Sequence, residues 1–368
     1  MQYLKTYLNK IESRGNTKLA ESVLKTAEEV GNSYIKTFSF TSHEIGLLFG
    51  NVQSGKTGQM FGIICKATDL GFPVFVLLTT DNVVLQQQTL DRVKADLDGY
   101  CICGENDAQI FIDNSLLQPT IVVLKKNARI LKLWANIFNS TGFMKGNPLF
   151  IVDDEADAAS LNTLVNKDRQ SSINKYLDSI KNVASSSIYL QVTGTPQAIF
   201  LQTVSSGWHP YFTYYFQPGN GYLGGDFFFP ASGKPECIQY LEEITEPTKN
   251  VVIRHIAVSA QILSSGGKVS NCLFHPSVKQ AVHQKYADEV IHALSWCTEH
   301  KNSEFTELLK QEYSLICPSK TEKVSYEAYM NKAYELLDSH LINVLIMNGK
   351  TDVDREQYEH GCNFVIGG

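Results

Sequence analysis

The chain has 368 residues, of which 43% are hydrophobic and 19% charged, a composition typical of a folded protein long enough for two domains. Its formal net charge of −6 excludes a protein that binds polyanions over its whole surface, so a nucleic acid would need a local basic patch. The eight scattered cysteines indicate reduced thiols. The charged N-terminus and the lack of a long apolar run predict a cytoplasmic chain without a membrane span.

Residues 1–38 carry apolar residues at helical spacing and predict a helical N-terminal extension. It consists of two helices separated at residues 14–17, and the second is expected to end at residues 31–33. Five continuous apolar runs then predict strands, with helical patterns between them, at residues 44–50, 73–80, 120–126, 148–157 and 187–195. This alternation predicts an α/β domain at residues 39–205, with a parallel sheet covered on both faces.

Residues 206–250 change character, because their first part is rich in aromatic residues, glycine and proline. We interpret them as an irregular segment followed by a polar linker. The aromatic side chains are expected to fill a core or cover a domain seam rather than stack on bases. A second α/β domain is predicted at residues 251–368, with an amphipathic helix at residues 278–297 and strands at residues 271–277, 340–351 and 362–368.

The string GNVQSGKT at residues 50–57 has the form G-x-x-x-x-G-K-[ST] of a phosphate-binding loop. A predicted strand precedes it and a predicted helix follows, so its backbone N–H groups would face phosphate oxygens at a helix N-terminus. Lys56 would reach the β- and γ-phosphates, and Thr57 would ligate Mg²⁺. A chance match in a chain of this length is roughly a one-in-a-hundred event, and the strand–loop–helix setting makes it rarer.

The acidic string D-E-A-D follows the fourth predicted strand and contains Asp154, Glu155 and Asp157. Catalytic groups of open α/β sheets collect at such strand ends. Asp154 would hold Mg²⁺ through its waters, and Glu155 would orient and deprotonate the attacking water. The alternative interpretation is a solvated acidic loop, and the phosphate loop in the same predicted sheet argues against it.

Thr193 and Thr195 lie in the string T-G-T-P at the end of the fifth predicted strand. Their hydroxyl groups could hydrogen-bond the acidic motif and link the nucleotide state to domain position. The same string is also an ordinary turn, so it adds little by itself.

The order of these three motifs resembles that of superfamily II helicase-type ATPases. The fuller strings GLLFGNVQSGKTGQ, IVDDEADAASLNT and VTGTPQAIF resemble the bacterial family of endonucleases with a Z-one (Z1) domain, over about residues 40–368. The resemblance implies a P-loop NTPase with one RecA-like domain followed by a second, incomplete one. It also implies a helicase-like, hydrolase-type ATPase core associated with restriction or phage defence.

The resemblance assigns roles to individual residues. Thr57 and Asp154 would hold the magnesium, whereas Asp157 would bond to Thr193 and Thr195 rather than to the metal. The family more often has T-A-T-P where this chain has T-G-T-P. Residues Gly50, Gln53, Ser54, Gly55, Lys56, Thr57 and Gly58 match the nucleotide loop.

In that family the strand ending in I-G-G is followed by arginine-bearing segments that close on the γ-phosphate, whereas this sequence stops at Gly368. We therefore expect a fragment that binds ATP and Mg²⁺ but hydrolyses ATP slowly by itself, because a facing arginine can be worth several powers of ten in turnover.

A nuclease site is not expected within the chain. Glu242, Glu243, Glu246 and Lys249 are interpreted as a charged linker, and His275 and His283 as packing or surface residues. Any nuclease is expected beyond the last residue or in a partner protein.

The leading hypothesis is therefore an ATP-driven motor or switch that acts on nucleic acid, most of all DNA, with nuclease or defence proteins as partners. Candidates for contacts with nucleic-acid phosphates are residues 86–89, with Gln88, and Arg92, Lys125 and Lys126, although ordinary surface polarity explains them equally well. The alternative is a nucleotide-gated protein-interaction module without translocation or nuclease activity, which the acidic net charge fits slightly better. A metabolic P-loop kinase would leave the D-E-A-D string and the second domain unexplained.

Overall fold

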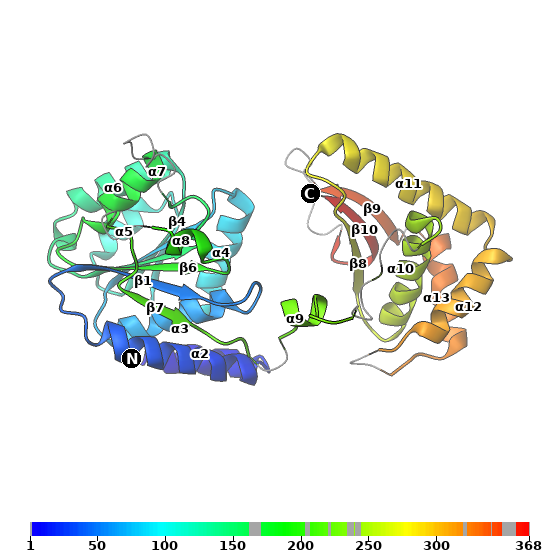
Figure 1. The fold of residues 1–368 in the computed structure, drawn as a ribbon, viewed down its shortest axis with the longest axis horizontal. Helices are drawn as coiled ribbons and strands as arrows, with labels where there is room; N and C mark the ends of the chain where they lie inside the picture. The colour runs from blue at the N-terminus through cyan, green and yellow to red at the C-terminus, as the bar shows by residue number, and fades with distance from the viewer. Residues whose placement is uncertain are drawn as a thin grey trace. The chain divides into compact units, whose positions relative to one another are not determined.

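The structure is a computed structural model that describes residues 2–161, 171–202, 207–219, 222–233, 239, 244–318, 322–339, 341–347 and 358–367. The chain divides into two compact units, Met1–Pro235 and Glu236–Gly368 (Figure 1). Each unit has a parallel sheet and a hydrophobic core of its own.

A seven-stranded sheet forms the centre of the first unit, in the order β3-β4-β2-β5-β6-β1-β7, with parallel pairing between neighbours. The strands are β1 (His43–Phe49), β2 (Val74–Thr79), β3 (Cys101–Cys103), β4 (Thr120–Lys125), β5 (Leu149–Asp154), β6 (Ser187–Thr193) and β7 (Phe212–Tyr215). The predicted α/β, RecA-like fold is confirmed by this sheet. Because β6 lies between β1 and β5, the three motif-bearing strands end side by side.

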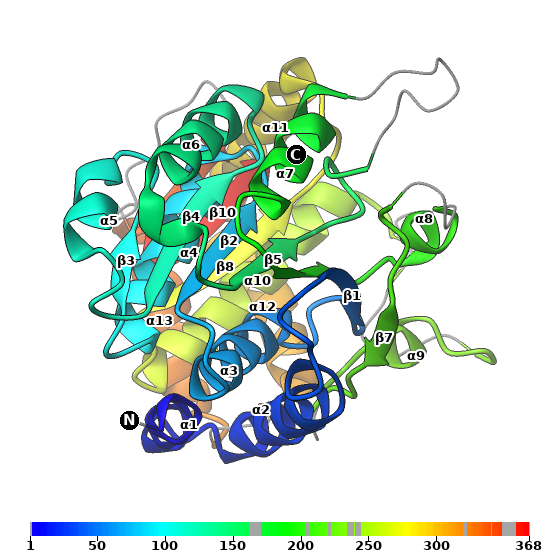
Figure 2. The same ribbon diagram turned by 90° about the vertical axis from the view of Figure 1, so that its left-hand side faces the viewer.

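Helices cover both faces of this sheet (Figure 2). The helical elements are α1 (Tyr3–Ser13), α2 (Thr17–Val30), the π-helical turn η1 (Gly31–Ile35), α3 (Lys56–Asp69), α4 (Val83–Asp96), α5 (Ala108–Asn114), α6 (Ala128–Ser140), the 3₁₀ turn η2 (Gly142–Met144), α7 (Ser172–Lys181), α8 (Gln197–Phe200) and α9 (Gly225–Phe228). One core packs α1–α4 against the sheet and the other packs α5–α7 against the opposite face. Alternate residues of β2, β4, β5 and β6 therefore enter different cores, which explains the continuous apolar runs.

The second predicted helix does not end at residues 31–33, as the sequence suggested. It continues through η1, because Gly31 keeps a right-handed helical conformation and leaves room for the Lys66 side chain of α3. A Cβ at Gly31 would lie 2.5 Å from Cγ of Lys66, so a larger residue would keep the two helices apart.

The aromatic segment is not wholly irregular, because it contains the edge strand β7. This strand pairs with β1, and the ring of Phe212 covers Gly46, where a Cβ would lie only 2.1 Å from the ring. Tyr34 of η1 stacks on Phe212 with ring centroids 4.1 Å apart. The expectation that these aromatic residues pack is met by Phe212 and also by Phe216, which is fully buried.

The second unit contains a three-stranded parallel sheet in the order β8-β10-β9. Its strands are β8 (Val269–Phe274), β9 (Ile342–Met347) and β10 (Gly361–Gly367), and its helices are α10 (Pro247–Ser264), α11 (Gln280–Glu299), α12 (Glu304–Leu315) and α13 (Tyr326–Asp338). The three predicted strands are present where the chain is described; residues 340, 348–351 and 368 lie outside that part. The predicted linker gives way to α10 at Pro247, and α12 and α13 were not predicted.

Three asparagines cross the second sheet in register, with Asn363 of β10 between Asn271 and Asn343. Their side-chain amides form two hydrogen bonds of 2.7 Å. His255 of α10 packs beneath them, 3.1 Å from the Asn363 carbonyl oxygen. Burial lowers the pKa of His255 to about 4, although its hydrogen bonds to the backbone of Asn363 and Ser270 favour the protonated form. His255 is therefore neutral at pH 7.

None of the helices in the described ranges is long and apolar enough to cross a membrane.

Acidification should destabilise the second unit. The pKa of His255 is about 4 in the fold and near 6.5 in the unfolded chain, so the unfolded chain takes up the proton first as the pH falls. We expect a loss of about 2 kcal/mol in the free energy of unfolding between pH 7 and pH 5. Hydrogen exchange of α10 and β10 measures this, with His255→Gln as the non-titrating control. An equal pH dependence in both proteins would contradict the assignment.

Candidate nucleotide-binding site

The phosphate-loop string forms a tight turn between β1 and α3. Gln53 and Gly55 have φ angles of 57° and 91°, in the left-handed region where glycine is at no steric disadvantage. The Ser54 hydroxyl donates a 2.5 Å hydrogen bond to the Asn51 carbonyl and closes the turn. The unpaired backbone N–H groups of the first turn of α3, which begins at Lys56, can therefore bind an anion.

The three sequence motifs meet at Lys56. Its Nζ lies 3.7 Å from Oε1 of Glu155, and the Lys56 side chain is largely buried, with 12% exposure. On the other side is Gly194, where a Cβ would lie 3.0 Å from the same Nζ. The glycine in T-G-T-P thus leaves more room for the Lys56 ammonium group. The alanine found more often at this position in the Z1-domain family would leave less. The structure brings Lys56, Glu155 and the end of β6 together.

Asp157 ties the acidic string to the threonine string. The hydroxyl groups of Thr193 and Thr195 donate 2.6 Å hydrogen bonds to its two different carboxylate oxygens. Burial favours the protonated form of Asp157, but these hydrogen bonds outweigh burial and hold its pKa below the ordinary value. The contact expected from the sequence is present, whereas the proposed coupling between nucleotide state and domain position remains a prediction.

Asp154 is placed where a cation would be favoured. Burial, followed by the negative charge of Glu155, raises the pKa of Asp154 to about 6, while Lys126 and Lys56 act in the opposite direction. A divalent cation would stabilise the ionised carboxylate. The carboxylate of Asp154 and the hydroxyl of Thr57 are oxygen donors of the kind that Mg²⁺ prefers. The residues present therefore fit a magnesium ion.

Lys126 is not a surface residue. Its side chain is fully buried, and its Nζ lies 3.1 Å from Oδ1 of Asp153, which is equally buried. The same Nζ donates to the backbone carbonyls of Asp154 and Glu155, at 2.8 and 2.7 Å. The other carboxylate oxygen of Asp153 accepts a 2.7 Å hydrogen bond from the Tyr189 hydroxyl. The sequence interpretation of Lys126 as a nucleic-acid contact is therefore wrong, because the ammonium is enclosed by these groups.

The other nucleic-acid candidates differ in exposure. Lys125 is only partly exposed and its Nζ lies 3.6 Å from the Glu105 carboxylate, while Gln86 is buried. Gln88 and Arg92 are exposed on α4. Arg92 also lines a cavity of about 400 Å³ together with Thr57 and Gly58. Gln88 and Arg92 thus remain candidates, and Lys125 is a weaker one because a carboxylate already neutralises it.

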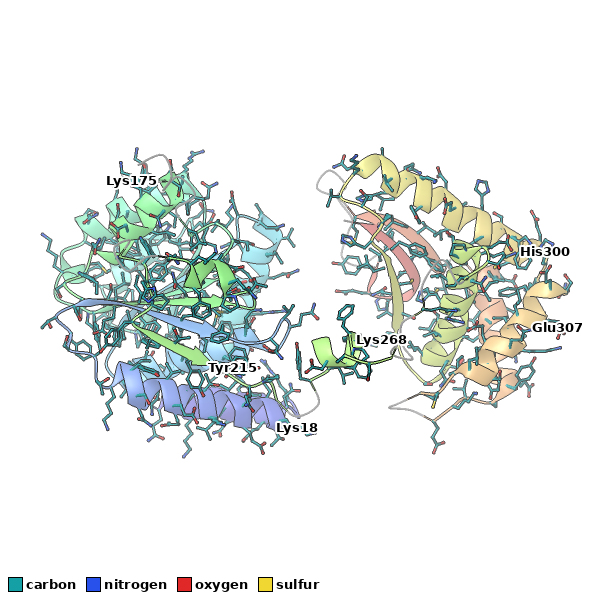
Figure 3. The ribbon with its side chains drawn as sticks, viewed as in Figure 1. Lys18, Lys175, Tyr215, Lys268, His300 and Glu307 are labelled. Carbon is teal, nitrogen blue, oxygen red and sulfur yellow. The ribbon has the colours of Figure 1, made fainter. Side chains whose placement is uncertain are left out.

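Aromatic residues at the end of β7 and after it contact the phosphate loop, which sequence reasoning missed. The Tyr215 hydroxyl donates to Oδ1 of Asn51 at 3.1 Å, and the Tyr222 hydroxyl donates to the Val52 carbonyl at 2.5 Å. The ring of Phe216 lies against Gly50, where a Cβ would be 2.3 Å from it. Tyr215 is labelled in Figure 3. Only the aromatic composition of the segment hinted at this, since no spacing connects it to residues 50–52.

The residues considered for a nuclease make ordinary contacts. His275 and His283 hydrogen-bond the backbone carbonyls of Gly367 and Ser277, at 2.9 and 2.6 Å. Glu246 and Lys249 form an ion pair at the start of α10, and residues 242–243 lie outside the described residues. Within the part of the chain that is described, no group of three or more His, Cys, Asp or Glu side chains is arranged to hold a metal ion.

No protein-family model and no curated protein matches the chain. Among solved structures, the helicase domain of Pyrococcus furiosus Hef is similar with a TM-score of 0.39 and 11% identity, over 93% of this chain and 84% of that one. The Aeropyrum pernix ORC2 protein, in ADPNP–ADP complexes, gives a TM-score of 0.27 and 12% identity, over 85% and 94% of the two chains. Drosophila ORC bound to GC-rich DNA and Cdc6 gives 0.25 and 12%, over 86% and 94%.

Structural similarity at this level establishes neither a family nor a function for the chain. The fold class rests instead on the parallel sheet, its strand order and the phosphate loop between β1 and α3. Together these define an α/β protein of the P-loop type.

Removing the buried ammonium should destabilise the first unit. Lys126→Met leaves the Asp153 carboxylate buried without its cation, and breaking such a pair costs about 3–5 kcal/mol. Urea unfolding followed by hydrogen exchange in β5 and β6 measures the loss. The control is Lys175→Met on the exposed surface of α7 (Figure 3), which should change the free energy of unfolding by less than about 0.5 kcal/mol. Equal stabilities of the two variants would contradict the importance of the pair.

Proposed function

We propose that this protein binds and hydrolyses ATP with Mg²⁺ and uses the nucleotide cycle to drive a helicase-like motor or switch on nucleic acid, with DNA as the first candidate. The single observation that carries the proposal is the meeting of Lys56, Glu155 and the Gly194 backbone at neighbouring strand ends. A phosphate-binding lysine beside a carboxylate that can act as a base is an arrangement that supports phosphoryl transfer to water.

The surroundings of each residue in the site indicate its role in the reaction. The loop N–H groups and Lys56 hold the phosphates, so Lys56 turns from Glu155 toward the nucleotide when it binds. Glu155, whose side chain is 42% exposed, is then free to orient the attacking water and accept its proton. Thr57 and Asp154 would hold Mg²⁺, which would neutralise part of the phosphate charge when bound. Asp157, already bonded through both oxygens, transmits the change to Thr193 and Thr195.

Nucleic acid would bind through backbone phosphates rather than through bases. Gln88 and Arg92 on α4 are the exposed candidates in the first unit, and α4 follows β2 of the same sheet. A contact made mostly by cationic and amide side chains to phosphates is insensitive to sequence and sensitive to salt. A role in restriction or phage defence rests on the family resemblance alone, and slow hydrolysis by the chain alone remains a prediction.

A nucleotide-gated protein-interaction module is the second candidate. It is favoured by the burial of Lys126 and the pairing of Lys125 with Glu105, which remove two cations from the supposed nucleic-acid surface of a chain with net charge −6. In this case ATP binding would control a partner protein without translocation.

Two substitutions separate binding from chemistry. Lys56→Ala should weaken ATP binding at least tenfold, because the cation facing the β- and γ-phosphates is lost. Glu155→Gln should bind ATP with little change and lower kcat about 100-fold or more, because the amide cannot accept the proton. Fluorescent-nucleotide titration and steady-state phosphate release measure the two effects. Lys175→Ala on α7 is the control. Full activity of Glu155→Gln would contradict the assignment of Glu155 as the catalytic base.

Nucleic acid should stimulate the ATPase if the protein is a motor. Double-stranded DNA, single-stranded DNA and RNA are compared at low and at physiological salt, and the stimulation should fall steeply with salt. Arg92→Ala should weaken the stimulation several-fold without changing basal turnover. If none of the three polymers binds or stimulates, while a partner is captured only in ATP, the interaction module is the correct reading.

A further inference from the structure

Lys126 connects two strands that are not neighbours. It directly follows β4, and β2 lies between β4 and β5 in the sheet. Its side chain therefore crosses the end of β2 to reach the carbonyls of Asp154 and Glu155 at the end of β5, at 2.8 and 2.7 Å. Two successive carbonyl groups point at one ammonium group, which fixes the orientation of both peptide planes.

The backbone of the acidic string needs such a constraint. Glu155 has a φ angle of 52°, in the left-handed region that residues with a Cβ rarely adopt. The following N–H, of Ala156, donates to the Val192 carbonyl of β6 at 3.0 Å. The turn is thus held from β4 through Lys126 and from β6 through Val192. The direction of the Glu155 side chain depends on this conformation.

Lys126 is too deeply buried to reach a ligand. Its Nζ donates hydrogen bonds to the two carbonyls and forms an ion pair with Asp153, whose Oδ1 lies 3.1 Å away without accepting a hydrogen bond. Asp153 is itself fixed by the Tyr189 hydroxyl, and the Lys126, Asp153 and Tyr189 side chains are all fully buried. Lys126 therefore acts on the site through the backbone and not by touching the nucleotide.

We propose that Lys126 is a positioning residue for ATP hydrolysis: through two backbone hydrogen bonds it holds the left-handed turn at Glu155 that points this carboxylate into the nucleotide site. The inference rests on the proposed ATPase function. It adds that the buried lysine after β4, with Asp153 as its counter-ion, sets the geometry of the catalytic base.

The kinetic test uses a charge-neutral double variant, Lys126→Met with Asp153→Asn, because it removes the two carbonyl contacts without leaving a buried charge unpaired. Lys175→Met, on the exposed surface of α7, is the control. We expect the Kd for a fluorescent ATP analogue to change by less than threefold, while kcat falls at least tenfold; the control should change neither. An unchanged kcat in the double variant would overturn the proposal.

A double-mutant cycle separates positioning from general damage. If Lys126 acts through Glu155, the double substitution should lower kcat no further when introduced into Glu155→Gln. A further tenfold fall would mean that the lysine acts by another route. If the neutral pair does not fold, Lys126→Leu with Asp153→Asn, which also lacks the N–H donors, is tested against the same two outcomes.

Hydrogen exchange supplies a readout that needs no activity. In the nucleotide-free protein, the amides of residues 154–158 should exchange at least tenfold faster in the double variant than in the unsubstituted chain, and those of residues 50–59 should not change. Equal exchange at residues 154–158 would overturn the positioning role. If the turn is loosened as expected but the unsubstituted chain neither binds nor hydrolyses ATP, the proposed function fails and the structural inference stands.

Discussion

The site depends on the position of β6 between β1 and β5. Parallel strands end at the same edge of a sheet, so this order brings the phosphate loop, the threonine string and the acidic string into contact. The Gly50 N–H reaches the Thr193 carbonyl at 3.4 Å, and Lys56 lies between Glu155 and Gly194. If β1 and β5 were direct neighbours, Asp157 would have no threonine hydroxyls beside it, and the acidic string would lose its link to β6.

Four carboxylates within five residues would repel one another, and the structure gives each a different environment. Asp153 turns into the core, where Lys126 neutralises its charge and the Tyr189 hydroxyl hydrogen-bonds one of its oxygens. Both carboxylate oxygens of Asp157 accept hydrogen bonds from threonine hydroxyls. This leaves Asp154, whose pKa is raised to about 6, and Glu155 beside Lys56. The two residues suited to a cation and to a water molecule are thus the two whose carboxylates, among the described residues, contact only the acidic string itself and Lys56.

Glycines of β1 and the phosphate loop form a surface for aromatic rings from far along the chain. Gly46 accommodates Phe212 and Gly50 accommodates Phe216, and a Cβ at either position would collide with the ring. Tyr222 extends this contact to the carbonyl of Val52 within the loop. The phosphate loop is therefore packed from its outer side by the same segment that forms the edge strand β7. A change of loop conformation on nucleotide binding must therefore change the contacts between the loop and that segment.

The sequence alone determined five of the seven strands of the first sheet, the parallel α/β class and the identity of the phosphate loop, because continuous apolar runs and the spacing of glycine, lysine and threonine are local properties of the chain. It also indicated that Asp157 would bond to the threonine string. It missed β3, which is only three residues long. It could not predict β7, whose existence depends on a glycine about 165 residues earlier in β1. Nor could it distinguish Lys125 from Lys126, adjacent lysines at one strand end. Only the tertiary structure decided that Lys126 is buried, because its counter-ion Asp153 and the Tyr189 hydroxyl that bonds Asp153 come from two other strands.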